Sequence, residues 1–392
     1  MRLTHSALAL SALSVLAACG GPSTTDTGLQ DADAAVADDV PGIDAVVPTC
    51  DASVPLVTGS ATGAADPLGA AAGQVRAGVV SAAMLPTDHT GLAVWAAGDY
   101  VIANDRIAVM IEAARPSALY DPWGGKPVGL AHVQGGHMVD AADFNESMFL
   151  LGRYTVATES VTVLHDGTDG VATIRAEGPL RPLPFIDELT RPIITGDYAG
   201  FRAALDYELR PGADQIDVYE TIDVNTTRPV FVRIVGHGFF QRFRMPMFVP
   251  GVGFSNGVGI APSPWVGFVD DEAVGFAWSS PDGPLTSLLS VSGFDIFTSP
   301  AVTLPACAQT RVHIARIVVG GRVLDGLLQA VARVDGVAQR EVRGMVTEAD
   351  ATPAVGVDVH ATVTGAGGAY LTRATTDATG AFTLHVPATQ SA

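Results

Sequence analysis

The sequence predicts an all-β protein: a large β-sandwich, preceded by a disordered linker and followed by a partial small β-sandwich of the seven-stranded type. Glycine and proline are abundant, with 43 Gly and 25 Pro in 392 residues, as expected for short strands joined by frequent turns. Short apolar or alternating segments recur throughout residues 57–340, which is the pattern of strands. Only residues 323–334 convincingly repeat apolar side chains at helical spacing.

Charged residues are few and mostly acidic. The chain contains 22 Lys and Arg residues against 41 Asp and Glu residues, which gives a formal net charge of −19. A surface of this sign does not attract the phosphates of nucleic acid or the head groups of anionic lipids, so we expect no nucleic-acid partner. Hydrophobic residues make up 48% of the chain, which is enough for a large core.

The N-terminus has the pattern of an export signal. A weakly basic start precedes an apolar run over residues 7–16, which is too short to span a bilayer as a helix. The Leu-Ala-Ala-Cys that ends at Cys19 resembles the lipobox of bacterial lipoproteins. The resemblance implies a signal peptide over residues 1–18, palmitate on Cys19 and a lipid anchor in the membrane of the bacterial cell envelope. Gly20 is typical of sorting to the outer membrane. The alternative is an ordinary secretory signal cleaved near Ala18.

Residues 19–56 form an acidic spacer. Aspartate recurs in it and Lys and Arg are absent, so it cannot bury enough apolar surface to offset its ordering entropy, and we expect a disordered linker. Cys50 lies near its end, and Cys307 is the other cysteine that remains once Cys19 is lipidated. In an oxidising envelope these two could form a disulfide or remain free thiols, and both alternatives stay open because the sequence gives no distance.

The sandwich, predicted over residues 57–340, opens with a strand pair and an aromatic loop. Two apolar runs, residues 99–103 and 107–112, are joined by a polar turn and predict the strands. The Asp-Pro-Trp-Gly-Gly segment at 121–125 predicts a tight loop. Exposed aromatic rings in such a loop would stack on a sugar or pack against a partner, although the same rings could belong to the core. The candidate ligand-binding residues are Tyr120, Asp121 and Trp123.

Residues 341–392 resemble a carboxypeptidase regulatory-like domain. The segment Val-Arg-Gly-Met-Val at 342–346 matches the leading V-x-G-x-V strand of these domains, and residues 376–382 match their T-D-x-x-G-x-F segment. The resemblance implies a small seven-stranded β-sandwich. Such domains continue with at least two further strands, so this chain is expected to hold a partial copy with an open sheet edge.

Residues 90–345 resemble the β-rich N-terminal region of deltaproteobacterial CehA/McbA-type PHP metallohydrolase proteins. The resemblance is carried by Gly-Asp-Tyr-Val-Ile-Ala-Asn-Asp-Arg at 98–106, Tyr-Asp-Pro-Trp-Gly-Gly at 120–125 and Tyr-Glu-Leu-Arg-Pro-Gly at 207–212. In that group a sandwich precedes a regulatory-like domain and a metallohydrolase domain that binds metals through His-x-His. No His-x-His segment occurs in this sequence, so the resemblance implies a region without a catalytic centre.

Two local patterns contain the residue types of chemical sites. His132 and His137, with Asp140, are metal candidates because imidazole and carboxylate suit a divalent transition metal, but a polar loop explains them equally well. Gly-Phe-Ser-Asn-Gly at 253–257 has the letters of a nucleophile elbow. The prolines and glycine that follow prevent the helix that this motif requires. We therefore predict no catalytic residue and no cofactor.

These features predict a lipid-anchored cell-envelope protein that acts as a binding or scaffold module. Its expected partners are the membrane, through the anchor, and a cell-surface carbohydrate or protein. The alternative is that the chain is the non-catalytic N-terminal part of a PHP-type metal-dependent hydrolase whose catalytic domain it lacks.

Overall fold

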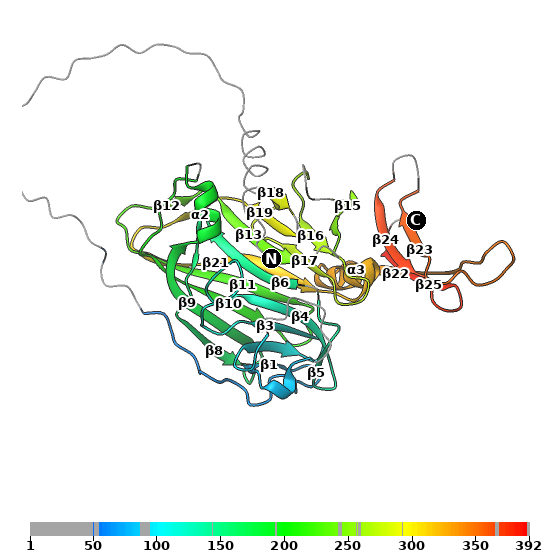
Figure 1. The fold of residues 1–392 in the computed structure, drawn as a ribbon, viewed down its shortest axis with the longest axis horizontal. Helices are drawn as coiled ribbons and strands as arrows, with labels where there is room; N and C mark the ends of the chain where they lie inside the picture. The colour runs from blue at the N-terminus through cyan, green and yellow to red at the C-terminus, as the bar shows by residue number, and fades with distance from the viewer. Residues whose placement is uncertain are drawn as a thin grey trace, which may run out of the picture.

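The computed structural model describes residues 50, 55–86, 95–142, 144–192, 194–241, 245–255, 257, 260–291, 293–364 and 368–389. Antiparallel strands dominate these residues (Figure 1). The predicted all-β fold with a large β-sandwich is confirmed. The predicted signal peptide, Cys19 and the linker up to residue 49 lie outside the described residues. Within the described ranges, no helix is long and apolar enough to cross a membrane.

The first sheet contains five antiparallel strands in chain order. They are β1 (Val75–Val79), β2 (Tyr100–Asn104), β3 (Ile107–Ile111), β4 (Pro127–Gln134) and β5 (His137–Val139), and a 3-10 helix, η2 (Ala82–Met84), follows β1. Gly135 and Gly136 join β4 to β5 with φ angles of +58° and +77°, the conformation of a two-residue hairpin turn. The alternative of a polar loop around His132 and His137 is therefore wrong, because both residues lie on strands.

The second sheet is much larger and contains fourteen strands. Its order is β15-β14-β16-β17-β21-β11-β10-β9-β7-β6-β13-β19-β18, with β8 paired to β9. The bounds are β6 Phe144–Leu151, β7 Tyr154–Val156, β8 Ser160–Asp166, β9 Ala172–Pro182, β10 Arg202–Leu209, β11 Gln215–Val224, β13 Val235–Gln241, β14 Met247–Val249, β15 Gly253–Ser255, β16 Trp265–Phe268, β17 Phe276–Ser279, β18 Thr286–Val291, β19 Phe294–Ser299 and β21 Ala308–Val319. A separate pair is formed by β12 (Val230–Val232) and β20 (Val302–Leu304).

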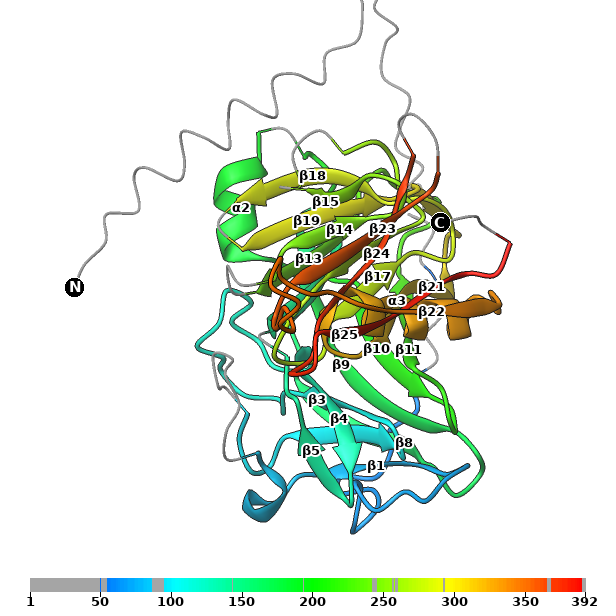
Figure 2. The ribbon, with the colours of Figure 1, turned by 90° about the vertical axis from the view of Figure 1, so that its right-hand side faces the viewer.

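The two sheets share one hydrophobic core. Ile102 and Val109 of the first sheet belong to the same buried cluster as Tyr207 and Val218 of β10 and β11, and as Trp278 of β17. Figure 2 shows β1, β3, β4 and β5 of the first sheet in the lower part of the view, beside β8 of the large sheet and below its other labelled strands. Along β10 the odd-numbered residues face this core, so the even-numbered residues lie on the outer face of the sheet. This alternation determines which side chains are available for binding.

Two α-helices of the described part cover the large sheet. The helix α3 (Val323–Val334) has the range that the sequence predicts, and it buries Leu324, Leu327 and Ala330 against the sheet. The short helix α2 (Pro184–Thr190) was not predicted, because it spans only seven residues and carries no long periodic pattern. It contributes Ile186 to an apolar cluster with residues of β6, β13 and β19.

The C-terminal residues form two antiparallel strand pairs next to α3 (Figure 1). One pair is β22 (Gln339–Met345) with β25 (Ala381–Pro387), and the other is β23 (Asp358–Thr362) with β24 (Tyr370–Thr375). Within the described residues each of these strands has a single partner. The buried Asp325 of α3 accepts hydrogen bonds from the Thr372 hydroxyl at 3.1 Å and the His385 backbone N–H at 2.7 Å. This carboxylate therefore joins the C-terminal strands to the sandwich.

Candidate functional site

The loop over residues 121–125 is as tight as its sequence predicts. The N–H of Gly125 donates to the carbonyl of Glu112 at 2.8 Å, which closes the loop at its base. Gly125 has a φ of +81°, and a Cβ at this position would lie 2.4 Å from Oγ1 of Thr158. Glycine is therefore required here both by the backbone conformation and by the close packing. The closed loop gives Tyr120 a defined position.

Tyr120 ends a stack of three aromatic rings, Tyr120, Phe240 and Phe294, which we call the Tyr120 stack. Its ring lies 4.0 Å from that of Phe240 at an angle of 5°, and Phe240 lies 4.0 Å from Phe294 at 8°. The two phenylalanines are buried on β13 and β19, whereas Tyr120 is 50% exposed. One face of the Tyr120 ring thus packs on Phe240, and the Phe185 ring lies 5.4 Å away at an angle of 56°, which leaves about half of the residue exposed. Trp123 is half-buried and packs against the same apolar cluster.

Beneath the loop lies a buried charged group of residues, the Lys126 network, made of Glu112, Asp121, Lys126 and Glu146. Lys126 Nζ donates to Oε2 of Glu112 and to the carbonyl of Asp121, each at 2.9 Å. It also donates to the carbonyl of Trp123 at 2.5 Å. The Glu146 carboxylate, on β6, accepts the backbone N–H groups of Tyr120 at 2.9 Å and Asp121 at 3.2 Å. These bonds fix the backbone of the loop from Tyr120 to Trp123.

Burial changes the ionisation of two carboxyl groups in this network. It raises the pKa of Glu146 to about 7 and that of Asp121 to about 6, while the charge of Lys126 acts in the opposite direction on both. Asp121 is 3% exposed, and its Oδ1 accepts the N–H of Trp123 at 3.0 Å. This burial contradicts the prediction that Asp121 contacts a ligand. Its role is to hold the loop, while Tyr120 is the exposed member of the predicted set.

The predicted metal candidates do not form a metal site in the structure. His132 Nδ1 lies 3.6 Å from Oδ2 of Asp140, whose other oxygen accepts a hydrogen bond from Arg322. Arg322 is thus paired with the Asp140 carboxylate that a metal ion would need as a ligand. His137 is exposed at the start of β5 and is not part of this contact. Within the described ranges, no group of three or more His, Cys, Asp and Glu side chains is placed to bind a metal.

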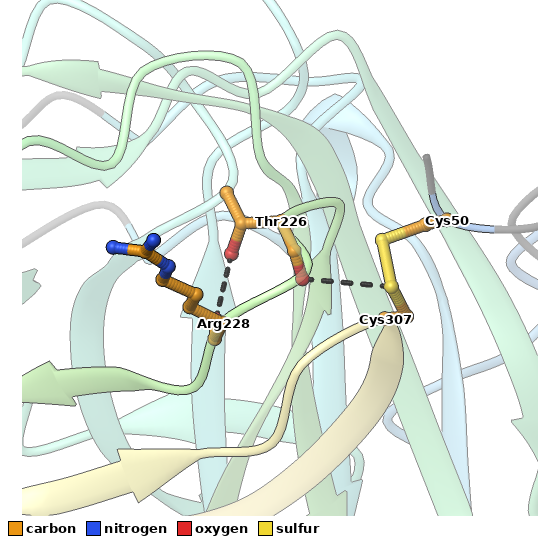
Figure 3. The surroundings of a disulfide bond; sticks show 4 residues. All are labelled: Cys50, Thr226, Arg228 and Cys307. Carbon is orange, nitrogen blue, oxygen red and sulfur yellow. Dashed lines mark hydrogen bonds between the residues drawn. A yellow bond between two sulfur atoms is a disulfide. The ribbon is translucent and has the colours of Figure 1, made fainter. Parts of the chain in front are cut away.

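The structure contains a disulfide between Cys50 and Cys307, with a Cα–Cα distance of 5.1 Å (Figure 3). The backbone N–H of Cys307 also donates to the carbonyl of Thr226 at 3.0 Å. The disulfide fastens the last residues of the N-terminal spacer to the segment between β20 and β21. Cys19 lies outside the described residues.

The nucleophile-elbow pattern at 253–257 and two buried aspartates, Asp187 and Asp270, have local structural roles. Gly253–Ser255 form the short strand β15, and the Ser255 hydroxyl accepts the N–H of Gly257 at 3.2 Å. Asp187 forms ion pairs with Arg153 and Arg191 around α2. Asp270 accepts backbone N–H groups from the two residues at 272 and 273. Each acidic group is thus used to hold local backbone or a neighbouring arginine.

Sequence reasoning did not find the partners that give Tyr120 its position. Phe240 is buried, as is usual for phenylalanine, but its stacking on Tyr120 depends on a strand more than a hundred residues away. Glu146 carried no signal beyond its charge. Its burial on β6 could have been suspected from Phe144 and Met148, which lie two residues to either side of it and so share its face of the strand by alternation.

Comparisons with known proteins give likeness of fold only. No family model matches the sequence, and no curated protein matches it. Among solved structures, a GH36 alpha-galactosidase from Geobacillus stearothermophilus in complex with stachyose is similar over 60% of this chain, with 11% identity and a TM-score of 0.37. This chain covers 42% of that enzyme. A galactose mutarotase related enzyme from Lactobacillus acidophilus is similar over 56% of this chain and 97% of its own, with 9% identity and a TM-score of 0.32. The resemblance to PHP metallohydrolase proteins stays a prediction.

Proposed function

We propose that this protein is a cell-envelope module that binds carbohydrate through the Tyr120 stack. The observation that carries the proposal is an exposed tyrosine ring held parallel to two buried phenylalanine rings. The apolar C–H face of a sugar ring packs well on a flat aromatic ring, and the tyrosine hydroxyl adds a polar group at its edge. A ring that is already fixed loses little conformational entropy when a ligand binds to it.

The Lys126 network supports this role because it fixes the main chain that carries Tyr120. Glu146 holds the N–H groups of Tyr120 and Asp121, and Lys126 holds the carbonyls of Asp121 and Trp123. These backbone groups of Tyr120, Asp121 and Trp123 are therefore satisfied within the protein. Ligand binding does not have to order the loop first.

The attachment of the module to the membrane is also part of the proposal. The lipobox-like segment at Cys19 would supply the anchor, and the acidic residues that follow would supply a spacer. The disulfide between Cys50 and Cys307 supports a fixed exit point for this spacer, since it joins residue 50 to the sandwich covalently. We propose that the protein is located in the outer membrane, because the residue after the cysteine to be lipidated is Gly20.

The test is a glycan array probed with the full chain and with single variants. Tyr120→Ala should weaken binding at least tenfold to the glycans that the native protein binds on the array. Tyr120→Phe, which keeps the ring, should bind these glycans with nearly the native affinity. The matched control is Phe231→Ala, which removes an exposed aromatic ring on β12 that is 61% exposed and outside the stack. Retention of no glycan, or equal loss in the Tyr120→Ala and Phe231→Ala proteins, would refute the proposal.

A further inference from the structure

A groove lies on the outer face of the large sheet, over β8, β9, β10 and β21. We call it the Arg311 groove. It has a volume of about 400 Å³, within the range of small-ligand sites. The strand register places four side chains in one row across the sheet. Arg175 of β9 lies opposite Asp206 of β10, and Asp206 lies opposite Tyr219 of β11. Tyr219 in turn lies opposite His313 of β21. All four side chains point away from the core because residues on these strands alternate between faces.

The floor of the groove is a complete ion pair. Arg175 Nε and Nη2 donate to the two oxygens of Asp206 at 2.6 and 2.7 Å, the bidentate geometry that satisfies a buried carboxylate. Both residues are at least nine-tenths buried. The Asp206 oxygens are therefore already occupied, and the floor supplies shape and rigidity rather than a binding group.

Arg311 is arranged differently from Arg175. Its guanidinium lies over the ring of Tyr219, 3.5 Å from the centroid, and that ring also stacks on His313 at 4.4 Å. The nearest carboxylate oxygens belong to Asp206 and Glu208 and lie 3.6 and 3.7 Å from its nitrogens, beyond hydrogen-bond distance. The side chain is 45% exposed. Stacking thus holds the planar group in place while leaving its N–H groups available to an anion.

The rim of the groove offers acceptors beside this donor. Glu208 receives a hydrogen bond from Arg210 at 2.6 Å, and Asp169 contacts His165 at 2.7 Å. The side chains of Asp169 and His165 are about half exposed. A ligand with negative charge alone would be repelled by these two carboxylates. A ligand that combines a carboxylate with neighbouring hydroxyl groups satisfies both the arginine and the acceptors.

We propose that the Arg311 groove binds a carboxylate-bearing saccharide, with the uronic acid carboxylate on Arg311 and sugar hydroxyls on Glu208 and Asp169. A peptide carboxylate fits less well, because Leu164 and Val171 are the main apolar side chains that line the groove. This inference goes beyond the proposed function, since it concerns other strands and another ligand charge. Arg311 and Tyr120 can be tested separately.

The experiment is calorimetric titration of the full chain with short oligomers of galacturonate, glucuronate and mannuronate. Each acid is paired with its methyl ester, which keeps the hydroxyls and removes the charge. At least one acid should bind, its ester should bind at least tenfold more weakly, and added salt should weaken the acid more than the ester. Arg311→Gln should weaken binding of the acid at least tenfold.

The control is Arg202→Gln, which removes an exposed arginine from the same face of β10 outside the groove, where it pairs with Glu159 and Glu177. Arg311→Gln should fold normally because Asp206 keeps its bidentate bonds to Arg175, and the melting temperature will report this. The inference is overturned if none of the three acids binds, if acid and ester bind equally, or if both arginine variants lose the same affinity. Tyr120→Ala should leave the affinity for the acid unchanged.

Discussion

Replacing Lys126 by Met tests whether the Lys126 network holds the candidate loop. Lys126 is 2% exposed and is the cation closest to Glu112, at 2.9 Å. Removing one partner of a buried ion pair costs about 3–5 kcal/mol, because the other charge is left without compensation. Arg115 also contacts Glu112, at 3.4 Å, and its charge offsets part of the cost of leaving Glu112 without Lys126. The carbonyls of Asp121 and Trp123 lose a donor as well, so we expect a loss of about 3 kcal/mol or more in the free energy of unfolding.

Urea denaturation followed by tryptophan fluorescence measures this change. Arg202→Met is the matched control, because Arg202 is 47% exposed and its ion pairs should contribute about 0–1 kcal/mol. The double variant Glu112→Gln with Lys126→Met should recover part of the loss, since it removes the stranded carboxylate. A loss below about 1 kcal/mol for Lys126→Met, or one equal to that of Arg202→Met, would show that the network does not stabilise the loop.

Two further predictions concern stability. Cys50→Ser opens a disulfide that joins residues 257 apart, and we expect up to about 5 kcal/mol less stability, seen as a lower melting temperature that no longer responds to reductant. An unchanged melting temperature would contradict this. Glu220 is buried, and burial raises its pKa to about 8. The folded form therefore loses stability as pH rises from about 4.5 through 8, at about 1.4 kcal/mol per pH unit, and Glu220→Gln should melt with a shallower pH profile. Parallel profiles for the two proteins would contradict this assignment.

The local part of the fold was predictable because it depends on neighbours in the sequence. The helix over 323–334 has the predicted range, and the strands predicted over 99–103 and 107–112 lie at Tyr100–Asn104 and Ile107–Ile111. The hairpin between β4 and β5 was missed although Gly135-Gly136 is a strong two-residue turn signal, because the flanking histidines were interpreted as metal candidates. The alternating Val-Gly-Val-Asp-Val segment at 355–359 suggests a strand, but the strand begins only at Asp358, since Gly356 adopts a φ of +71° and turns the chain.

The candidate site was predictable only in part. A tyrosine beside Asp-Pro-Trp-Gly-Gly indicates an exposed ring, and Tyr120 is exposed. Whether the neighbouring Asp121 is exposed depends on Glu146, which accepts its backbone N–H, and no rule of spacing connects the two residues. Burial of a carboxylate is decided by such distant partners.

The Arg311 groove was even less predictable from the sequence than the candidate site. Alternation along β10 indicates that Asp206 and Glu208 share a face, and the same rule places Arg311 and His313 together on β21. What alternation cannot give is the neighbour across the sheet. Between β9 and β10 the chain forms α2 and an irregular segment, and nine strands lie between β11 and β21 in the sequence. A shift of one residue in the pairing of β10 with β11 would turn Tyr219 toward the core, and the same shift in the pairing of β11 with β21 would turn Arg311 toward it. The groove therefore depends on the bulge between Val218 and Tyr219, where the register with β21 changes and brings Tyr219 opposite His313.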